Sequence, residues 1–177
     1  MARGEMKSSI GDKRKSSPKL RSQKELCFRH SEISHDINVY SLDAERADRL
    51  REVLQALYDV NKRLPIIVEG KRDVQALRKI GLAGEIITLH GGQGIYEFCE
   101  DLTERFSHVV LLMDWDDKGE KLFRSLADHL TGLWEEFAPL REILRVLCQK
   151  DIKDIEGMPG LLERLAGTAV TVGEETP

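Results

Sequence analysis

Three short apolar runs are spaced along the chain, separated by longer stretches in which apolar residues recur at helical intervals. The runs predict strands at 66–69, 85–90 and 108–113. Short apolar runs that contain β-branched residues and are bounded by glycine or charged residues are typical of strands buried on both faces. The pattern therefore predicts the centre of an α/β domain.

The stretches between the runs place apolar residues three and four positions apart, which predicts amphipathic helices that cover a sheet. Strands and helices alternate at the spacing of right-handed crossovers, so the sequence predicts a Rossmann-like parallel sheet flanked by helices. Residues 143–147 also fit a fourth strand, although their context favours a helix. The expected helices are 43–63, 72–80, 95–105, 118–137, 140–147 and 158–165.

The N-terminal segment lacks this periodicity and is rich in Ser, Lys and Arg. Segments of this composition bury too little apolar surface to offset the entropy lost on ordering, so we expect a disordered arm. The predicted organisation is an arm at 1–42, a helix packed on the sheet at 43–63, a domain at 64–167 and a frayed tail at 168–177.

Charge is distributed unevenly along the chain. Residues 1–30 hold nine Lys or Arg and three acidic residues, a net charge of +6, so the remainder of a chain whose total is −4 carries −10. A basic arm on an acidic body suits a polyanion such as nucleic acid, although it also fits a solvated extension. No run approaches the roughly 18 apolar residues of a membrane helix.

The three cysteines, Cys27, Cys99 and Cys148, are far apart and form no Cys-x-x-Cys pair. This spacing predicts neither a zinc site nor a disulfide framework. We therefore expect a cytoplasmic protein.

Carboxylates follow two of the apolar runs directly. Glu69 ends the first run, and Asp114 and Asp116 follow the third. Ligand sites of open parallel sheets lie at the carboxyl ends of the strands, so these side chains converge if the two strands are neighbours. Because like charges repel, a carboxylate cluster usually surrounds a cation, and Mg²⁺ prefers such oxygen ligands.

The segments Val-Glu-Gly-Lys-Arg-Asp at 68–73 and Asp-Trp-Asp-Asp-Lys-Gly at 114–119 resemble the two motifs of the Toprim domain. The likeness covers about residues 64–135 and extends toward Glu156, where Lys-Asp-Ile-Lys-Asp-Ile-Glu-Gly at 150–157 is a further echo. It is closest to small stand-alone Toprim proteins of archaea and bacteria. The bacterial nuclease that matures small ribosomal RNA has a similar Glu-Gly-Lys-x-Asp.

The resemblance implies a site with one or two Mg²⁺ ions, for which Mn²⁺ is a substitute. Glu69 would act as general acid or base or as a metal ligand, and Asp114 and Asp116 would hold the metal. Lys71 and Lys118 would offset phosphate charge, and Gly70 and Gly119 would let the backbone approach a phosphate. The residues expected around this set are Asp73, His90 and Asp117.

Several of these residues also have structural interpretations. The lysines fit solvated helix starts, Asp73 fits a helix cap, and 91–94 fits either a phosphate cradle or a simple turn. Trp115 is expected either in the core or stacked on a base.

The sequence lacks features that several classes of Toprim protein need, and this narrows the range of expected functions. A topoisomerase needs a tyrosine on a separate domain, and a primase needs a zinc module. The sequence therefore predicts a Mg²⁺-dependent nuclease that uses water to attack a phosphodiester, with RNA preferred over DNA. The alternative is a non-catalytic Toprim module that binds Mg²⁺ and a nucleic acid or nucleotide in a larger complex. A receiver domain fits the motifs poorly. The expected partner is nucleic acid, and no membrane is expected.

Overall fold

The computed structural model describes residues 23–89, 92, 94–167 and 172–173, with side chains described from residue 42 onward. Contacts divide the chain into two units, Met1–Asn38 and Val39–Pro177. The helix α1, Gln23–Asn61, crosses this boundary. The second unit holds the sheet and the predicted site, and all that follows concerns it.

A three-stranded parallel sheet forms the centre of this unit, in the order β2-β1-β3. The strands are β1, Ile66–Val68, β2, Ile86–Thr88, and β3, Val110–Leu111. Ile66 of β1 lies opposite Ile86 of β2 and Val110 of β3. The predicted parallel sheet is therefore confirmed, and the first and third strands are direct neighbours.

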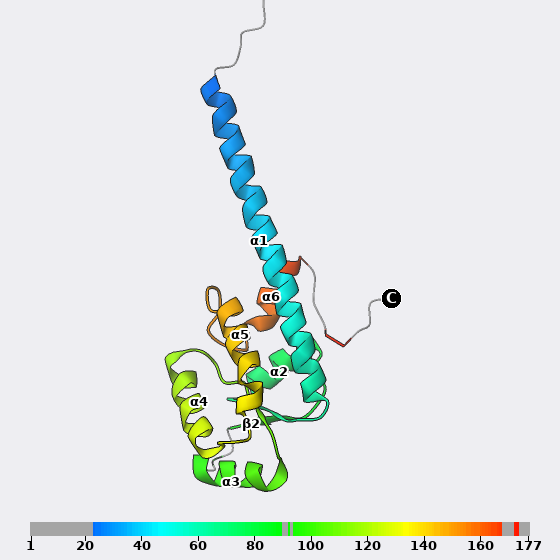
Figure 1. Cartoon of the computed structure of the whole chain (residues 1–177), viewed down its shortest axis with the longest axis vertical. Helices are drawn as coiled ribbons and strands as arrows, with labels where there is room; N and C mark the ends of the chain where they lie inside the picture. The colour runs from blue at the N-terminus through cyan, green and yellow to red at the C-terminus, as the bar shows by residue number, and fades with distance from the viewer. Residues whose placement is uncertain (1–22, 90–91, 93, 168–171, 174–177) are drawn as a thin grey trace, which may run out of the picture. The chain divides into compact units, whose positions relative to one another are not determined.

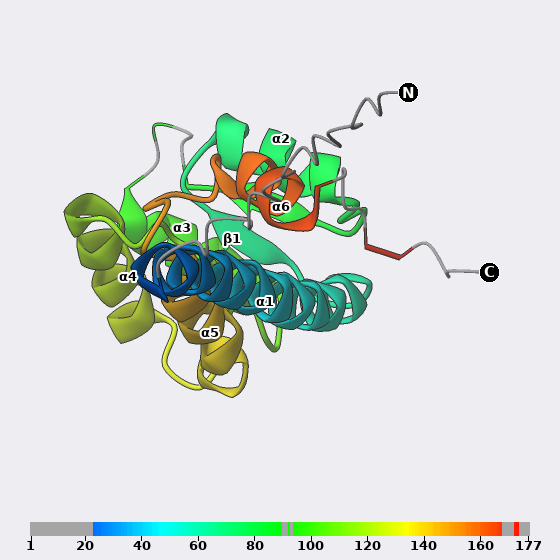
Figure 2. The same cartoon turned by 90° about the horizontal axis from the view of Figure 1, so that it is seen from above.

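The strands alternate their side chains between two apolar layers, as the period of two in a strand requires. Ile66 and Val68 point into a layer shared with α1, α2 (Lys71–Ile80), α5 (Ala138–Cys148) and α6 (Met158–Ala166). Ile67 points into the other layer, which α3 (Ile95–Arg105) and α4 (Asp117–His129) cover. Figure 1 and Figure 2 show these helices on either side of the strands. All three residues of β1 are fully buried, because β1 lies between β2 and β3 and both of its faces are covered.

The helix predicted over 118–137 is interrupted. α4 ends at His129, and a short 3₁₀ helix at Glu135–Phe137 leads into α5. Gly132 adopts a φ of 92°, which glycine tolerates and other residues rarely adopt, and its amide donates 2.9 Å hydrogen bonds to the Glu135 carboxylate. Apolar spacing alone did not reveal this turn. The fourth strand considered at 143–147 is instead part of α5.

The N-terminal helix is longer than predicted. α1 begins at Gln23, whereas the sequence indicated a helix from residue 43. Residues 1–22 of the predicted arm and His90 lie outside the described residues. Among the described residues, every helix is either too short or too polar to span a lipid bilayer.

Candidate functional site

The carboxyl ends of β1 and β3 bring the two motifs together. The amide of Leu112 donates a 2.9 Å hydrogen bond to the carbonyl of Ile67 in β1, so the ladder continues one residue past the end of β3. Glu69 follows β1 and Asp114 follows β3, and they leave the sheet at the same edge. The juxtaposition expected of neighbouring strands is therefore present.

Glu69 is buried, at 6% exposure, and its charge is met by a lysine from the second motif. The Nζ of Lys118, on the first turn of α4, lies 2.6 Å from the Oε2 of Glu69. The hydrogen bond to Glu69 is the largest cause of a raised Lys118 pKa, and the charges of Asp116 and Asp114 raise it further. Lys118 thus contacts one acid and lies in the field of the other two.

Asp114 is half-buried and accepts a 2.8 Å hydrogen bond on Oδ1 from the amide of Ile155. Burial raises the pKa of Asp114 to about 7, and the neighbouring carboxylates of Asp73, Glu69 and Asp154 add to the rise against the opposing effect of the Ile155 amide. Like charges that crowd a half-buried carboxyl favour its neutral form. A bound cation would reverse this balance.

Asp116 is exposed and caps α4, because its Oδ1 accepts a 2.7 Å hydrogen bond from the amide of Gly119. Asp117 is exposed at the first position of the helix. A Cβ at Gly119 would lie 2.3 Å from the carbonyl oxygen of Asp114, so α4 can begin this close to the strand end only with glycine here. The amide of Gly119 therefore makes its hydrogen bond within the protein.

The first motif has its own cap. Buried Asp73 accepts a 2.9 Å hydrogen bond from the amide of Gly70, as the structural interpretation of Asp73 predicted. Burial is the largest cause of a raised Asp73 pKa, which the charges of Glu69, Glu156 and Asp154 raise further. A Cβ at Gly70 would meet nothing within 4 Å, and Lys71 beside it is exposed. Open space for a ligand is therefore found at Gly70 rather than at Gly119.

A third segment, 152–157, completes the surroundings of the acids. Trp115 is 8% exposed and donates from Nε1 to the carbonyl of Ile152 at 2.7 Å, so it belongs to the core and does not offer a face to a base. The amide of Trp115 also donates to the carbonyl of Lys153 at 3.1 Å. These bonds bring Asp154 and Glu156 within electrostatic range of Asp73. The acidic echo at 150–157 was the sequence signal for this contact, although it did not assign a role to either residue.

The acids at this site have the chemistry that a metal ion needs, but their side chains are not arranged around a common point. Carboxylate oxygens are the ligands that Mg²⁺ prefers, and Mg²⁺ commonly uses only one or two of them together with water and phosphate. Among the described residues, however, no three His, Cys, Asp or Glu side chains are arranged to hold an ion as they stand. The Nζ of Lys118 lies 2.6 Å from Oε2 of Glu69, where it would compete with an ion for this oxygen. An ion that used Oε2 of Glu69 would therefore have to displace Lys118 from it.

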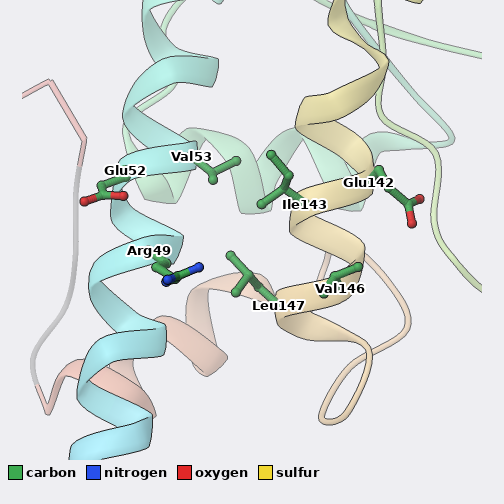
Figure 3. Close-up of a pocket in the computed structure, with 7 residues that line it drawn as sticks. All are labelled: Arg49, Glu52, Val53, Glu142, Ile143, Val146 and Leu147. Carbon is green, nitrogen blue, oxygen red and sulfur yellow. The ribbon is translucent and has the colours of Figure 1, made fainter.

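Two cavities lie between helices of this unit. One, of about 540 Å³, lies between α1 and α5, where Arg49, Val53, Ile143 and Leu147 line it, and none of the predicted acids does (Figure 3). The other, of about 310 Å³, lies between α2 and α6 and is lined by Arg72 and Glu156 among others. Only the second cavity adjoins the first motif.

Comparison with known proteins agrees with this geometry. The Toprim domain model matches residues 65–146, which include both motifs, so the fold and the sheet-edge acids define a Toprim protein. Toprim domains are associated with divalent metal ions and with nucleic-acid processing.

The relatives are small archaeal proteins. A UPF0292 protein of Methanosarcina barkeri is 34% identical over 136 residues, 73% of this chain and 90% of that protein. A UPF0292 protein of Pyrococcus furiosus is 35% identical over 127 residues, 72% of this chain and 92% of that protein. A solved structure of a protein from Aquifex aeolicus has a TM-score of 0.49 and 28% identity, and the match covers 59% of this chain and 94% of that one. The chain belongs to the UPF0292 family.

Proposed function

We propose that this protein is a Mg²⁺-dependent phosphodiesterase that hydrolyses nucleic acid, with RNA preferred over DNA. The observation that carries the proposal is the meeting of Glu69 and Asp114 at the carboxyl edge of two neighbouring strands, beside the exposed carboxylate of Asp116. The raised pKa of Asp114 supports it, because crowded carboxylates in a domain of this family are what a cation site requires.

In this proposal Asp114 and Asp116 hold the ion, and Glu69 either completes the site or accepts a proton from the attacking water. When bound, the ion would supply positive charge that acidifies water and neutralises the phosphate. Asp114 keeps Oδ2 for this purpose, since Oδ1 accepts from Ile155. Asp116 is similarly engaged through Oδ1 alone.

Lys118 is proposed to serve in two positions. In the first it holds Glu69 at 2.6 Å, which neutralises a buried carboxylate. In the second it turns toward a substrate phosphate, which its 67% exposed side chain can reach through solvent. Lys71 and the open space at Gly70 would receive the same phosphate from the other motif.

A second candidate function is a Toprim module that binds nucleic acid without cleaving it. The observation that favours it is the Lys118–Glu69 ion pair, because a lysine that stays on Oε2 of Glu69 competes there with an ion and with a proton. The two candidates differ in whether that pair opens.

Cleavage of end-labelled substrates separates them. Structured RNA, single-stranded DNA and duplex DNA are incubated with the protein in Mg²⁺, in Mn²⁺ and in chelator, with Glu69→Gln and Asp114→Asn as controls. We expect metal-dependent products from RNA that both variants lose. Binding of the same substrates without any metal-dependent product would contradict the nuclease and support the binding module.

A further inference from the structure

One buried arginine outside both motifs contacts the end of the third strand. Arg141 lies in the first half of α5 and is 4% exposed. No spacing in the sequence marks it, since it occurs among the apolar residues of an amphipathic helix. A guanidinium buried to this degree requires partners for its hydrogens, so its contacts indicate its purpose.

All of these contacts converge on the Asp-x-Asp loop and the helix that follows it. The Nε of Arg141 donates to the carbonyl of Met113 at 3.0 Å, and Nη2 donates to the carbonyl of Asp114 at 2.7 Å. Nη2 also lies 2.9 Å from Oε1 of Glu120 on α4. The guanidinium carbon lies 4.3 Å from the centre of the Phe123 ring, also on α4.

This arrangement fixes both acids of the motif through the main chain. The carbonyls of Met113 and Asp114 lie where the sheet has ended, and the planar guanidinium binds both at once. Glu120 and Phe123 tie the same group to α4, whose first turn sets Asp116 as its cap. One side chain therefore spans the segment before Asp114 and the helix after Asp116.

We propose that Arg141 is a positioning residue that holds the backbone of the Asp114–Asp116 loop in the geometry needed to receive a metal ion. This inference has two halves. The positioning half, that Arg141 holds the loop, concerns the loop itself. The metal half, that the loop held in this way receives an ion, rests on the proposed function. In this proposal Arg141 acts through the two carbonyls that it binds.

A merely structural arginine would lower stability everywhere, whereas a positioning arginine protects particular amides. Two amides report on the loop, because Gly119 donates to Oδ1 of Asp116 and Ile155 donates to Oδ1 of Asp114. The amide of Phe106, bonded to Leu102 in α3 at 2.9 Å, reports on the domain elsewhere.

The test is amide hydrogen exchange, followed by NMR in the metal-free protein, for Arg141→Lys. Lysine keeps the charge beside Glu120 but cannot bind two carbonyls as a planar fork. We expect the amides of Gly119 and Ile155 to exchange about fivefold faster relative to Phe106, the effect of losing one hydrogen bond of ordinary net strength. Unchanged relative exchange would overturn the proposal.

Arg46→Lys is the matched control. Arg46 is half-buried and, like Arg141, donates to a main-chain carbonyl, that of Leu147 at 2.6 Å, and to a carboxylate, that of Asp151. It does not contact the loop, so its loss should leave the relative exchange of Gly119 within twofold of wild type. Should Arg141→Lys fail to fold, Phe123→Leu removes the ring beneath the guanidinium. In that variant the amides of Gly119 and Ile155 should exchange a few-fold faster, and unchanged exchange would also overturn the proposal.

A titration with Mn²⁺, followed by the rise in melting temperature, tests the metal half on the same samples. Each variant is compared with its own metal-free baseline. Arg141→Lys should need about tenfold more Mn²⁺ for half the effect, and Arg46→Lys should match wild type. If wild type itself shows no Mn²⁺ effect, the proposed function fails while the exchange result still decides the positioning. If Mn²⁺ acts equally on wild type and Arg141→Lys, the metal half of the inference is overturned.

Discussion

The charge of Asp114 should make the metal-free protein less stable as the pH rises toward neutrality. Burial and the neighbouring carboxylates raise the pKa of Asp114 from 3.8 to about 7 in the folded protein. Between these values the folded state binds a proton that the unfolded state has lost. Stability is therefore greatest below the unfolded pKa and is lost as the pH rises through the folded pKa.

The size of the loss follows from the shift. One pH unit corresponds to about 1.4 kcal/mol for each proton, so a pKa that rises from 3.8 to about 7 limits the total loss of stability to roughly 4 kcal/mol. Asp114 is only half-buried, and solvent screens part of its interaction with the other acids. We therefore expect about 1–2 kcal/mol to be lost between pH 5 and pH 8. The raised pKa of Asp73 acts in the same direction.

Urea unfolding in chelator at pH 5 and pH 8 measures this loss for wild type and Asp114→Asn. Asparagine retains an oxygen for the amide of Ile155 but cannot ionise, so the variant should lose about 1–2 kcal/mol less than wild type over this range. Asp101→Asn, which removes an exposed carboxylate from α3, serves as the control and should follow wild type. Equal pH dependence in wild type and Asp114→Asn would refute the reasoning.

Three further outcomes follow from the same geometry. Below pH 7 protons compete with Mg²⁺ for Asp114, so the affinity measured by titration calorimetry should fall up to about tenfold per pH unit, and a flat profile would contradict this. Lys118→Met should bind Mg²⁺ more tightly, because the lysine no longer occupies Glu69, and should cleave nucleic acid more slowly. Weaker Mg²⁺ binding in calorimetry would contradict the proposal that Lys118 moves from Glu69 to a phosphate. Gly119→Ala should lower the free energy of unfolding by at least about 2 kcal/mol in urea, because its methyl group would lie 2.3 Å from the carbonyl of Asp114, and a smaller loss would show that α4 can shift.

The parallel sheet and the meeting of its two acidic motifs could be predicted because both depend on local patterns. The apolar runs that end at Glu69 and Asp114 are short and uniform, and right-handed crossovers leave few ways to arrange them. Helix 95–105 was predicted with the bounds that α3 has. The same periodicity ran through the turn at Gly132, because the leucines on either side of it keep helical spacing.

The parts that could not be predicted depend on contacts between distant segments. Arg141 lies 27 residues from Asp114, and nothing in its own helix indicates which carbonyl it meets. Trp115 was expected either in the core or stacked on a base, and the contact that decides for the core is with the carbonyl of Ile152, 37 residues away. The part played by Gly119 likewise depends on how closely α4 approaches the strand end, which sequence spacing does not fix.

Direct binding of Mn²⁺, followed by electron paramagnetic resonance at pH 8, tests the central claim that the sheet-edge carboxylates form a divalent metal site. The account predicts one or two bound ions in wild type, with binding lost in Asp114→Asn and weakened in Glu69→Gln. Binding that is absent from wild type, or that persists unchanged in both variants, would contradict it.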